Sequence, residues 1–196
     1  SAARLARRVV DKLKSNTIIA GSIGPTGELF EPLGELNFKK AINIFSEQGK
    51  GLFLGGIDVF WIETMSSIDE VKAAFIALKP YNLPIICTMS FDTVGKTMMG
   101  IEPKELKKLA YELNFDGFGA NCGVGPAELL DTICEFKVLK KEKIPIVAKG
   151  NCGIPEFVDG ITSYRALPET MGNYTKLSIS FNVKIIGGCC GTTPNH

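Results

Sequence analysis

The sequence lacks an excess of charge of either sign. Among its 196 residues, 22 Lys and Arg stand against 21 Asp and Glu, which gives a formal net charge of +1 at pH 7. General electrostatic attraction to nucleic acid or to an anionic membrane needs a basic field, and this balance does not supply one. The composition therefore predicts neither nucleic acid nor a membrane surface as a partner.

Long apolar runs and low-complexity linkers are also missing. No run approaches the roughly 18 apolar residues of a membrane-spanning helix. No Gly-, Pro- or Ser-rich stretch divides the chain, so residues 1–196 are expected to form a single domain. The six cysteines lack the dense spacing of a secreted disulfide scaffold, which predicts a reducing, cytoplasmic location.

Short apolar runs, in contrast, recur along the whole chain at the spacing of a βαβ repeat. The predicted strands are Thr17–Ser22, Ile57–Glu63, Pro84–Ser90, Asp116–Cys122, Pro145–Asn151 and Val183–Gly188. Their apolar residues are continuous rather than alternating, which is typical of parallel strands covered on both faces.

Helix signals fill the intervals between these runs. A first helix is expected over Ala2–Lys14, and Ser67 with Glu70 is expected to form a capping box at the start of another. The first helix has an apolar stripe of Leu5, Val9 and Leu13. Three further helices are expected to begin at a proline: Pro103, Pro126 and Pro168.

This alternation predicts an α/β fold with a parallel sheet. The chain opens on a helix that no strand precedes, which favours a (β/α)8 TIM barrel whose first two strands are missing from this sequence. An open, doubly wound sheet of the same strands is the alternative. Because a barrel without two strands has open edges, the segment alone is not expected to be active.

Polar and thiol side chains gather where the predicted strands end. Ligands of parallel α/β folds bind at the carboxyl ends of the strands, so these residues predict a functional site at one edge of the sheet. They are Ser22, Glu63, Ser90, Asp92, Cys122, Asn151, Cys189 and Cys190.

Two of these residues, Cys189 and Cys190, are neighbours in the chain. Adjacent side chains on a regular strand point to opposite faces, but glycines tolerate dihedrals that could bring both sulfurs to one point. Glycines lie on both sides of the pair: Gly187, Gly188 and Gly191. With Cys122 they offer three thiolates, which suit Zn²⁺ at about 2.3 Å and leave its fourth position open, as in catalytic sites.

Other roles for the cysteines stay open at this point. Cys87 and Cys134 are expected to be small buried hydrophobic residues. Cys152 follows Asn151 and is an alternative metal ligand. Cys189 and Cys190 could also form a strained vicinal disulfide or act as a thiol-redox pair.

Two other classes of protein also remain open. A structural zinc domain would need a fourth protein ligand, for which Cys152 and His196, the only histidine, are poor choices. A phosphate-binding barrel would use a glycine-rich loop to hold an anion, and that interpretation leaves the three cysteines unexplained. The glycines concerned are Gly119, Gly123 and Gly125.

Five segments resemble motifs of the homocysteine S-methyltransferase family, which includes betaine–homocysteine methyltransferase and the homocysteine module of cobalamin-dependent methionine synthase. They are GSIGPTGE (21–28), IDVFWIETMSS (57–67), GANCGVGP (119–126), AKGNCGIP (148–155) and IIGGCCGTTP (185–194). The likeness covers nearly the whole chain in the family's order. The family's first two strands, one with a DG-x-x-GT-like segment, are not found.

The resemblance implies a (β/α)8 barrel that binds zinc through Cys122, Cys189 and Cys190. The family transfers a methyl group to the thiol of homocysteine and forms methionine, so these cysteines would serve catalysis by making the substrate sulfur a thiolate. Glu63 matches a glutamate that holds the substrate ammonium group. Asn151 is expected to bind the amino acid or to approach the open metal position.

The expected partners are homocysteine and a small methyl donor. The segments GPTGELFEPLGEL (24–36) and SFDTVGKTMMG (90–100) resemble stand-alone bacterial homocysteine methyltransferases, which are often assigned to betaine. This resemblance implies betaine or a related methylated compound as the donor. The alternative is a module of a cobalamin- and methylfolate-dependent methionine synthase. A homo-oligomer is compatible with the sequence, which does not fix the number of copies.

Overall fold

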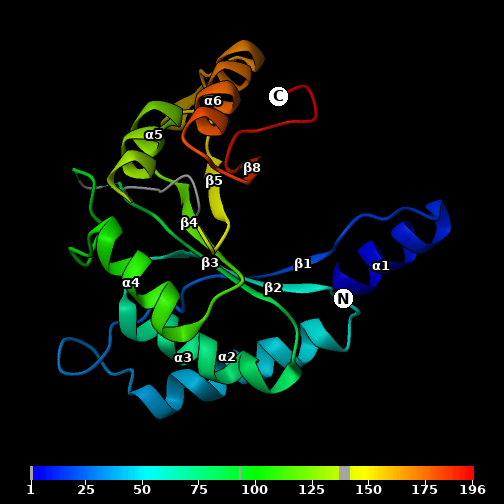
Figure 1. The fold of residues 1–196 in the computed structure, drawn as a ribbon, viewed down its shortest axis with the longest axis vertical. Helices are drawn as coiled ribbons and strands as arrows, with labels where there is room; N and C mark the ends of the chain where they lie inside the picture. Colours follow the sequence, from blue (N-terminus) through cyan, green and yellow to red (C-terminus); the bar gives the residue numbers. More distant parts are fainter. Residues whose placement is uncertain (1, 93, 137–141) are drawn as a thin grey trace. The chain divides into compact units, whose positions relative to one another are not determined.

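The computed structural model describes residues 2–92, 94–136 and 142–196 (Figure 1). The chain divides into two compact units, residues 1–87 and 88–196. The expectation of one domain over residues 1–196 stays a prediction. Among the described residues, every helix is too short or too polar to cross a lipid bilayer.

The first unit is a βαβα segment preceded by a helix. Its elements are α1 (Ala2–Leu13), β1 (Ala20–Ile23), α2 (Phe38–Phe53), β2 (Val59–Met65), α3 (Ile68–Leu78) and the short 3₁₀ helix η1 (Lys79–Tyr81), followed by the start of β3 (Ile85–Met89). β1 and β2 pair in parallel, with Ala20 opposite Val59. Helices α2 and α3 pack against each other along these strands (Figure 1).

The second unit continues the same alternation. It contains α4 (Pro103–Leu113), β4 (Gly117–Cys122), α5 (Pro126–Glu135), β5 (Ile146–Gly150), β6 (Glu156–Val158), β7 (Ile161–Ser163), α6 (Pro168–Ser180) and β8 (Ile185–Gly188). β5 pairs in parallel with both β4 and β8. Its core includes the buried rings of Phe118 and Phe136, which meet edge to face at 5.4 Å between centroids.

The strand order is β1-β2-β3-β4-β5-β8, which follows the order of the sequence. Sequential parallel strands with a helix in each crossover are the pattern of a (β/α) barrel, whereas a doubly wound sheet reverses its strand order at a switch point. The fold is therefore α/β of the partial TIM-barrel type, as the sequence predicts. Each of the six predicted strands overlaps an observed strand, with bounds that differ by a few residues.

The helix starts expected at prolines are confirmed, because α4, α5 and α6 begin at Pro103, Pro126 and Pro168. The predicted capping box of α3 is only half correct. The Ser67 side chain accepts a hydrogen bond from the Glu70 backbone at 3.4 Å. The Glu70 carboxylate is buried and instead accepts two hydrogen bonds, both 2.7 Å, from the backbone and hydroxyl of Thr26.

The first helix forms where expected, but its apolar stripe does not face a core. The three stripe residues are half exposed or more: Leu5 57%, Val9 49% and Leu13 69%. Helical spacing identified the stripe correctly, but it does not establish which surface a stripe covers. Only Ala3 of α1 is buried in the described structure.

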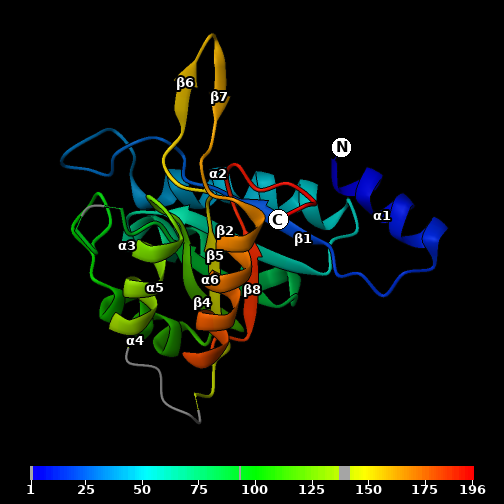
Figure 2. The same cartoon turned by 90° about the horizontal axis from the view of Figure 1, so that it is seen from above.

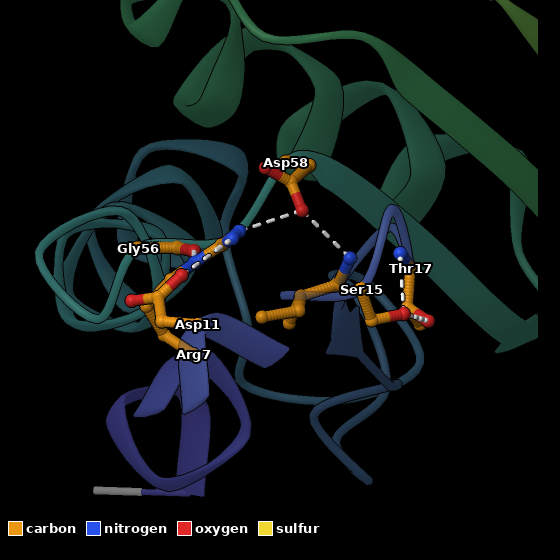
Figure 3. Close-up of polar contacts among 7 residues, drawn as sticks. Arg7, Asp11, Ser15, Thr17, Gly56 and Asp58 are labelled. Carbon is orange, nitrogen blue, oxygen red and sulfur yellow. Dashed lines mark hydrogen bonds and ion pairs between the residues drawn. The ribbon is translucent and has the colours of Figure 1, made fainter. Parts of the chain in front are cut away.

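A polar cluster joins α1 to the start of β2 (Figure 3). Arg7 donates through Nε to the Gly56 carbonyl at 2.8 Å and through Nη2 to Asp58 Oδ2 at 2.7 Å. The Ile19 backbone N–H donates to the same carboxylate oxygen at 2.7 Å. The Ile19 hydrogen bond first, and then Arg7, hold the pKa of Asp58 below its usual value.

The sequence interpretation did not name α2, the short 3₁₀ helix η1 or the β6–β7 hairpin. The hairpin projects away from the other strands of its unit (Figure 2). Its strands pair antiparallel through a two-residue turn, in which Asp159 and Gly160 both have positive φ, 52° and 79°. Asp-Gly is a strong signal for such a turn, so this hairpin was visible in the sequence.

Candidate metal centre

Cys122 is placed by an unusual end to β4. It is the last residue of that strand and adopts a left-handed backbone conformation with φ 59°, followed by Gly123 with φ 73°. A non-glycine residue in this region is strained, and such residues persist where the surrounding structure holds them, often at functional sites. The turn takes the Cys122 side chain out of the regular alternation of the strand.

Cys189 and Cys190 lie in the turn after β8, not on extended strand. The Cys189 N–H donates to the Gly150 carbonyl at 2.7 Å, and the Cys190 carbonyl accepts from the Cys152 N–H at 2.9 Å. Gly191 follows with φ 79°. Of the three glycines expected to relax the backbone, only Gly191 has positive φ, and the turn itself lets adjacent sulfurs face the same point.

The three sulfurs converge although 67 residues separate Cys122 from Cys189. Cys122 Sγ lies 3.1 Å from Cys189 Sγ and 3.6 Å from Cys190 Sγ. All three sulfur atoms lie within 4.8 Å of one another, and all three cysteines are free. Three sulfurs on one tetrahedral ion at about 2.3 Å would lie roughly 3.8 Å apart, so the cluster fits a single metal ion.

The surroundings of Cys189 favour its thiolate. The hydrogen bond from Cys122, opposed by burial and aided by the nearby Lys149 ammonium, lowers the pKa of Cys189 to about 5. The Asn121 amide also donates to Cys189 Sγ, at 3.8 Å. The pKa of Cys122 is raised correspondingly, first by its hydrogen bond to Cys189.

Asn151 follows β5 and is buried beside this turn. Its amide nitrogen donates to the Gly123 carbonyl at 2.6 Å, which fixes the orientation of the side chain. Its amide oxygen is buried and has no hydrogen-bond partner among the described residues. A buried acceptor without a partner costs about 1–3 kcal/mol, so this oxygen is suited to a ligand that the polypeptide does not supply.

Tyr164, in the loop that follows β7, lies beside the cysteine turn. Its ring packs so closely on Gly191 that a Cβ added there would come within 2.3 Å of Tyr164 Cγ. Burial first, and then the negative charge of the cysteines, raise the pKa of this phenol.

Glu63 lies in the first unit, two residues before the end of β2. Its Oε1 accepts a hydrogen bond from the Ser22 hydroxyl at 2.5 Å, across the β1–β2 pair. The side chain is half-buried. The predicted strand-end residues Ser22 and Glu63 are therefore brought together within this unit.

A model of the family described as homocysteine S-methyltransferase matches residues 1–196. The chain belongs to the homocysteine S-methyltransferase family.

Curated relatives of this family member include the methionine synthases of Mycobacterium leprae and Mycobacterium tuberculosis. Each is 28% identical over 202 residues and is matched by 98% of this chain. The match spans only 16% of the M. leprae protein and 17% of the M. tuberculosis protein. The chain therefore corresponds to about a sixth of those longer proteins.

Solved structures of the homocysteine methyltransferase MmuM from Escherichia coli share the fold of this family member. The apo form superposes with a TM-score of 0.72 at 18% identity, over 97% of this chain and 65% of MmuM. The metallated form gives a TM-score of 0.69 at 19% identity, over 97% of this chain and 64% of MmuM. At this identity the similarity supports the α/β barrel fold.

The remaining cysteines of this homocysteine S-methyltransferase family member lie outside the sulfur cluster. Cys87 is fully buried, as expected of a small hydrophobic residue. The same expectation for Cys134 is wrong, because this residue is exposed near the end of α5. Cys152 is buried and does not belong to the three-cysteine group found among the described residues.

The glycines that suggested a phosphate site have other roles in this structure. A Cβ added at Gly119 would lie 1.9 Å from the Val147 carbonyl oxygen, so glycine is needed there for close strand pairing. A Cβ added at Gly125 would lie 3.0 Å from the Glu128 carboxylate. A carboxylate at this position would repel a phosphate, which disfavours an anion cradle.

Three residues near the sulfurs were not singled out in the sequence. Asn121 could have been found, because it directly precedes Cys122 at a strand end. Lys149 lies on β5, two residues before Asn151, and carries no signal of its own. Tyr164 could not be placed, because its packing against Gly191 joins segments that are distant in the sequence.

Proposed function

We propose that this chain binds homocysteine and transfers a methyl group to its thiol, forming methionine. The observation that carries the proposal is the convergence of Cys122, Cys189 and Cys190 in a chain that the family model matches throughout. A free thiol is mostly protonated at neutral pH and is then a poor nucleophile, so the reaction needs a site that removes its proton.

Zn²⁺ is the ion that we propose for the three cysteines, since thiolate donors in a tetrahedral arrangement favour it. When bound, zinc would supply a Lewis acid that lowers the pKa of the substrate thiol and leaves it an electron-rich nucleophile. Cys122, Cys189 and Cys190 would hold the ion and fill three positions. Asn121 and Lys149 would offset part of the negative charge on Cys189.

Two further residues would bind the amino-acid end of homocysteine. Glu63 would accept hydrogen bonds from the substrate ammonium, with Ser22 holding the carboxylate in place. The unpartnered Asn151 oxygen would accept a hydrogen bond from the substrate or approach the open metal position. These assignments follow from residue chemistry at the strand ends, where barrels carry their active sites.

The methyl donor distinguishes two forms of the proposal. The donor predicted from the sequence is betaine or a similar small methylated compound. The similarity to the two mycobacterial methionine synthases favours the alternative, in which the chain is the homocysteine module of a larger methionine synthase. In both forms the methyl group leaves its donor for the homocysteine sulfur, whose proton is released to solvent.

The test is a methionine-formation assay on the natural full-length protein. Homocysteine would be offered with betaine, S-methylmethionine, methylcobalamin or methyltetrahydrofolate in turn, before and after treatment with a chelator. We expect methionine with one donor class, loss of activity after metal removal and recovery with Zn²⁺. Full activity in the metal-free protein would contradict the zinc proposal, and no methionine with any donor would contradict the reaction.

A further inference from the structure

In the first unit, two sets of hydrogen bonds connect β1 and its following loop to the chain that carries Glu63. The first is the bond from the Ser22 hydroxyl to Glu63 Oε1 at 2.5 Å. The second lies beyond the strands, where Glu70 Oε1 accepts hydrogen bonds from the Thr26 backbone and the Thr26 hydroxyl, both at 2.7 Å. The segment from Glu63 to Glu70 is therefore fastened at both of its ends.

The backbone between these two contacts is strained. Thr64, directly after Glu63, has a left-handed conformation with φ 62°. This region is unfavourable for a β-branched residue, which keeps such a conformation only where the surrounding structure holds it. Because Thr64 is the next residue in the chain, relaxation of its backbone would move Glu63. The position of the Glu63 carboxylate thus depends on what holds this turn.

Glu70 is placed to hold the turn from its far side. It is the third residue of α3 and is 4% exposed. Burial of a carboxylate is costly unless it accepts hydrogen bonds, and bonds to a carboxylate are stronger than those to a neutral acceptor. Asp69, in the same turn of the helix, is exposed. Of these two acidic residues, Glu70 is the one that bonds to the loop after β1.

We propose that Glu70 is a positioning residue for substrate binding. By joining α3 to the loop after β1, it maintains the strained turn at Thr64 and keeps Glu63 directed at the substrate ammonium group. The inference rests on the proposed function, since it takes Glu63 as the residue that binds this group. It also explains why the Glu70 carboxylate bonds to a distant loop instead of completing a capping box on its own helix.

The test compares two ligands of the zinc-loaded, natural full-length protein by isothermal titration calorimetry. Homocysteine carries the ammonium group, and its deamino analogue 4-mercaptobutyrate does not. In Glu70→Ala we expect the Kd for homocysteine to rise about tenfold and the Kd for 4-mercaptobutyrate to stay unchanged, because only homocysteine uses Glu63. Glu70→Gln should bind both ligands as the unmodified protein does, since its amide oxygen can accept both bonds from Thr26.

Asp69→Ala is the matched control, because it removes a carboxylate from the same helical turn and leaves the bonds to Thr26 in place. Both Kd values should be unchanged in this variant. An unchanged Kd for homocysteine in Glu70→Ala, or an equal loss of affinity for the two ligands, would overturn the positioning role.

Thr26→Val provides a second test if Glu70→Ala does not fold. It removes one of the two hydrogen bonds to Glu70 and should raise the Kd for homocysteine alone, by about threefold. No change in this Kd would overturn the inference. If the unmodified protein binds homocysteine no more tightly than 4-mercaptobutyrate, the ammonium site in the proposed function is wrong, and the role of Glu70 falls with it.

Discussion

Two polar clusters join distant parts of the sequence, and they differ in whether their polar groups have hydrogen-bond partners within the described chain. In the first unit, the Asp58 carboxylate receives Arg7 and the Ile19 N–H, each at 2.7 Å (Figure 3). In the second unit, three sulfurs crowd together and the buried Asn151 oxygen has no partner among the described residues. A cluster that is complete within the chain stabilises the fold, whereas an incomplete one is suited to a ligand.

The largest effect should come from removing a sulfur. Changing Cys122, Cys189 or Cys190 to Ala should each reduce bound zinc and lower methionine formation by more than about a hundredfold, beyond the usual effect of an outer partner of a metal ligand. Metal content and turnover measure this. Cys134→Ala is the control, because Cys134 is free, exposed and outside the group. Equal losses in the control would remove the distinction between the sulfur cluster and any other cysteine.

Neutralising Glu63 should weaken substrate binding and leave the metal in place. A hydrogen bond to a charged group is worth about 1.5–3 kcal/mol, so Glu63→Gln should raise the KM for homocysteine by roughly 10–150-fold. Glu28→Gln removes an exposed carboxylate of the same unit and should have little effect. An unchanged KM, or zinc loss in Glu63→Gln, would contradict the role given to Glu63.

The unpartnered oxygen of Asn151 can be tested separately from its amide nitrogen. Asn151→Asp keeps an oxygen but loses the donor to the Gly123 carbonyl, whereas Asn151→Ala loses both groups. If the oxygen serves substrate or metal, turnover should fall about tenfold or more in the alanine variant and less in the aspartate variant. Equal rates in the two variants would show that only the hydrogen bond to Gly123 matters.

The smallest effect is expected at the Arg7–Asp58 cluster, and it should concern stability only. Asp58→Asn should lower the free energy of unfolding by about 1–2 kcal/mol, since the carboxylate is partly exposed and its contacts are screened. Zinc binding should be unchanged. Asp11→Asn is the control, because Asp11 lies 3.7 Å from Arg7 and is 63% exposed. A change in zinc affinity in Asp58→Asn would contradict the claim that the Arg7–Asp58 cluster affects stability only.

The pH dependence of this effect has a definite sign. The folded pKa of Asp58 is lowered, so the carboxylate adds stability above its unfolded pKa of about 3.9 and loses it as pH falls through the folded value. The difference between the unmodified protein and Asp58→Asn should therefore be constant above about pH 5 and shrink in acid. Urea unfolding at several pH values measures it, and a difference that grows in acid would contradict this sign.

The sequence predicted the strands of the sheet and several helix starts well, because these features depend on local signals. Apolar runs located all six strands of the sheet, and prolines located the first residues of α4, α5 and α6. The exposed stripe of α1 shows the limit of such signals. Spacing along a helix gives the apolar face, but which surface covers that face is a tertiary property.

The sequence predicted which cysteines form the site better than it predicted the geometry of the site. Repeated glycines beside Cys122, Cys189 and Cys190 indicated turns, and the structure brings the three sulfurs together. The left-handed backbone was expected at glycines but also occurs at Cys122 itself, which side-chain chemistry does not indicate. Tyr164 and Lys149 approach through neighbouring strands and loops, and no local pattern marks a residue whose partner is distant in the sequence.

X-ray absorption at the zinc edge of the purified full-length protein tests the central claim most directly. We predict one zinc ion per chain with three sulfur ligands at about 2.3 Å, and fewer sulfurs in each of the Cys122, Cys189 and Cys190 variants. A bound zinc coordinated mainly by nitrogen and oxygen, or a spectrum unchanged by any of the three substitutions, would contradict the account.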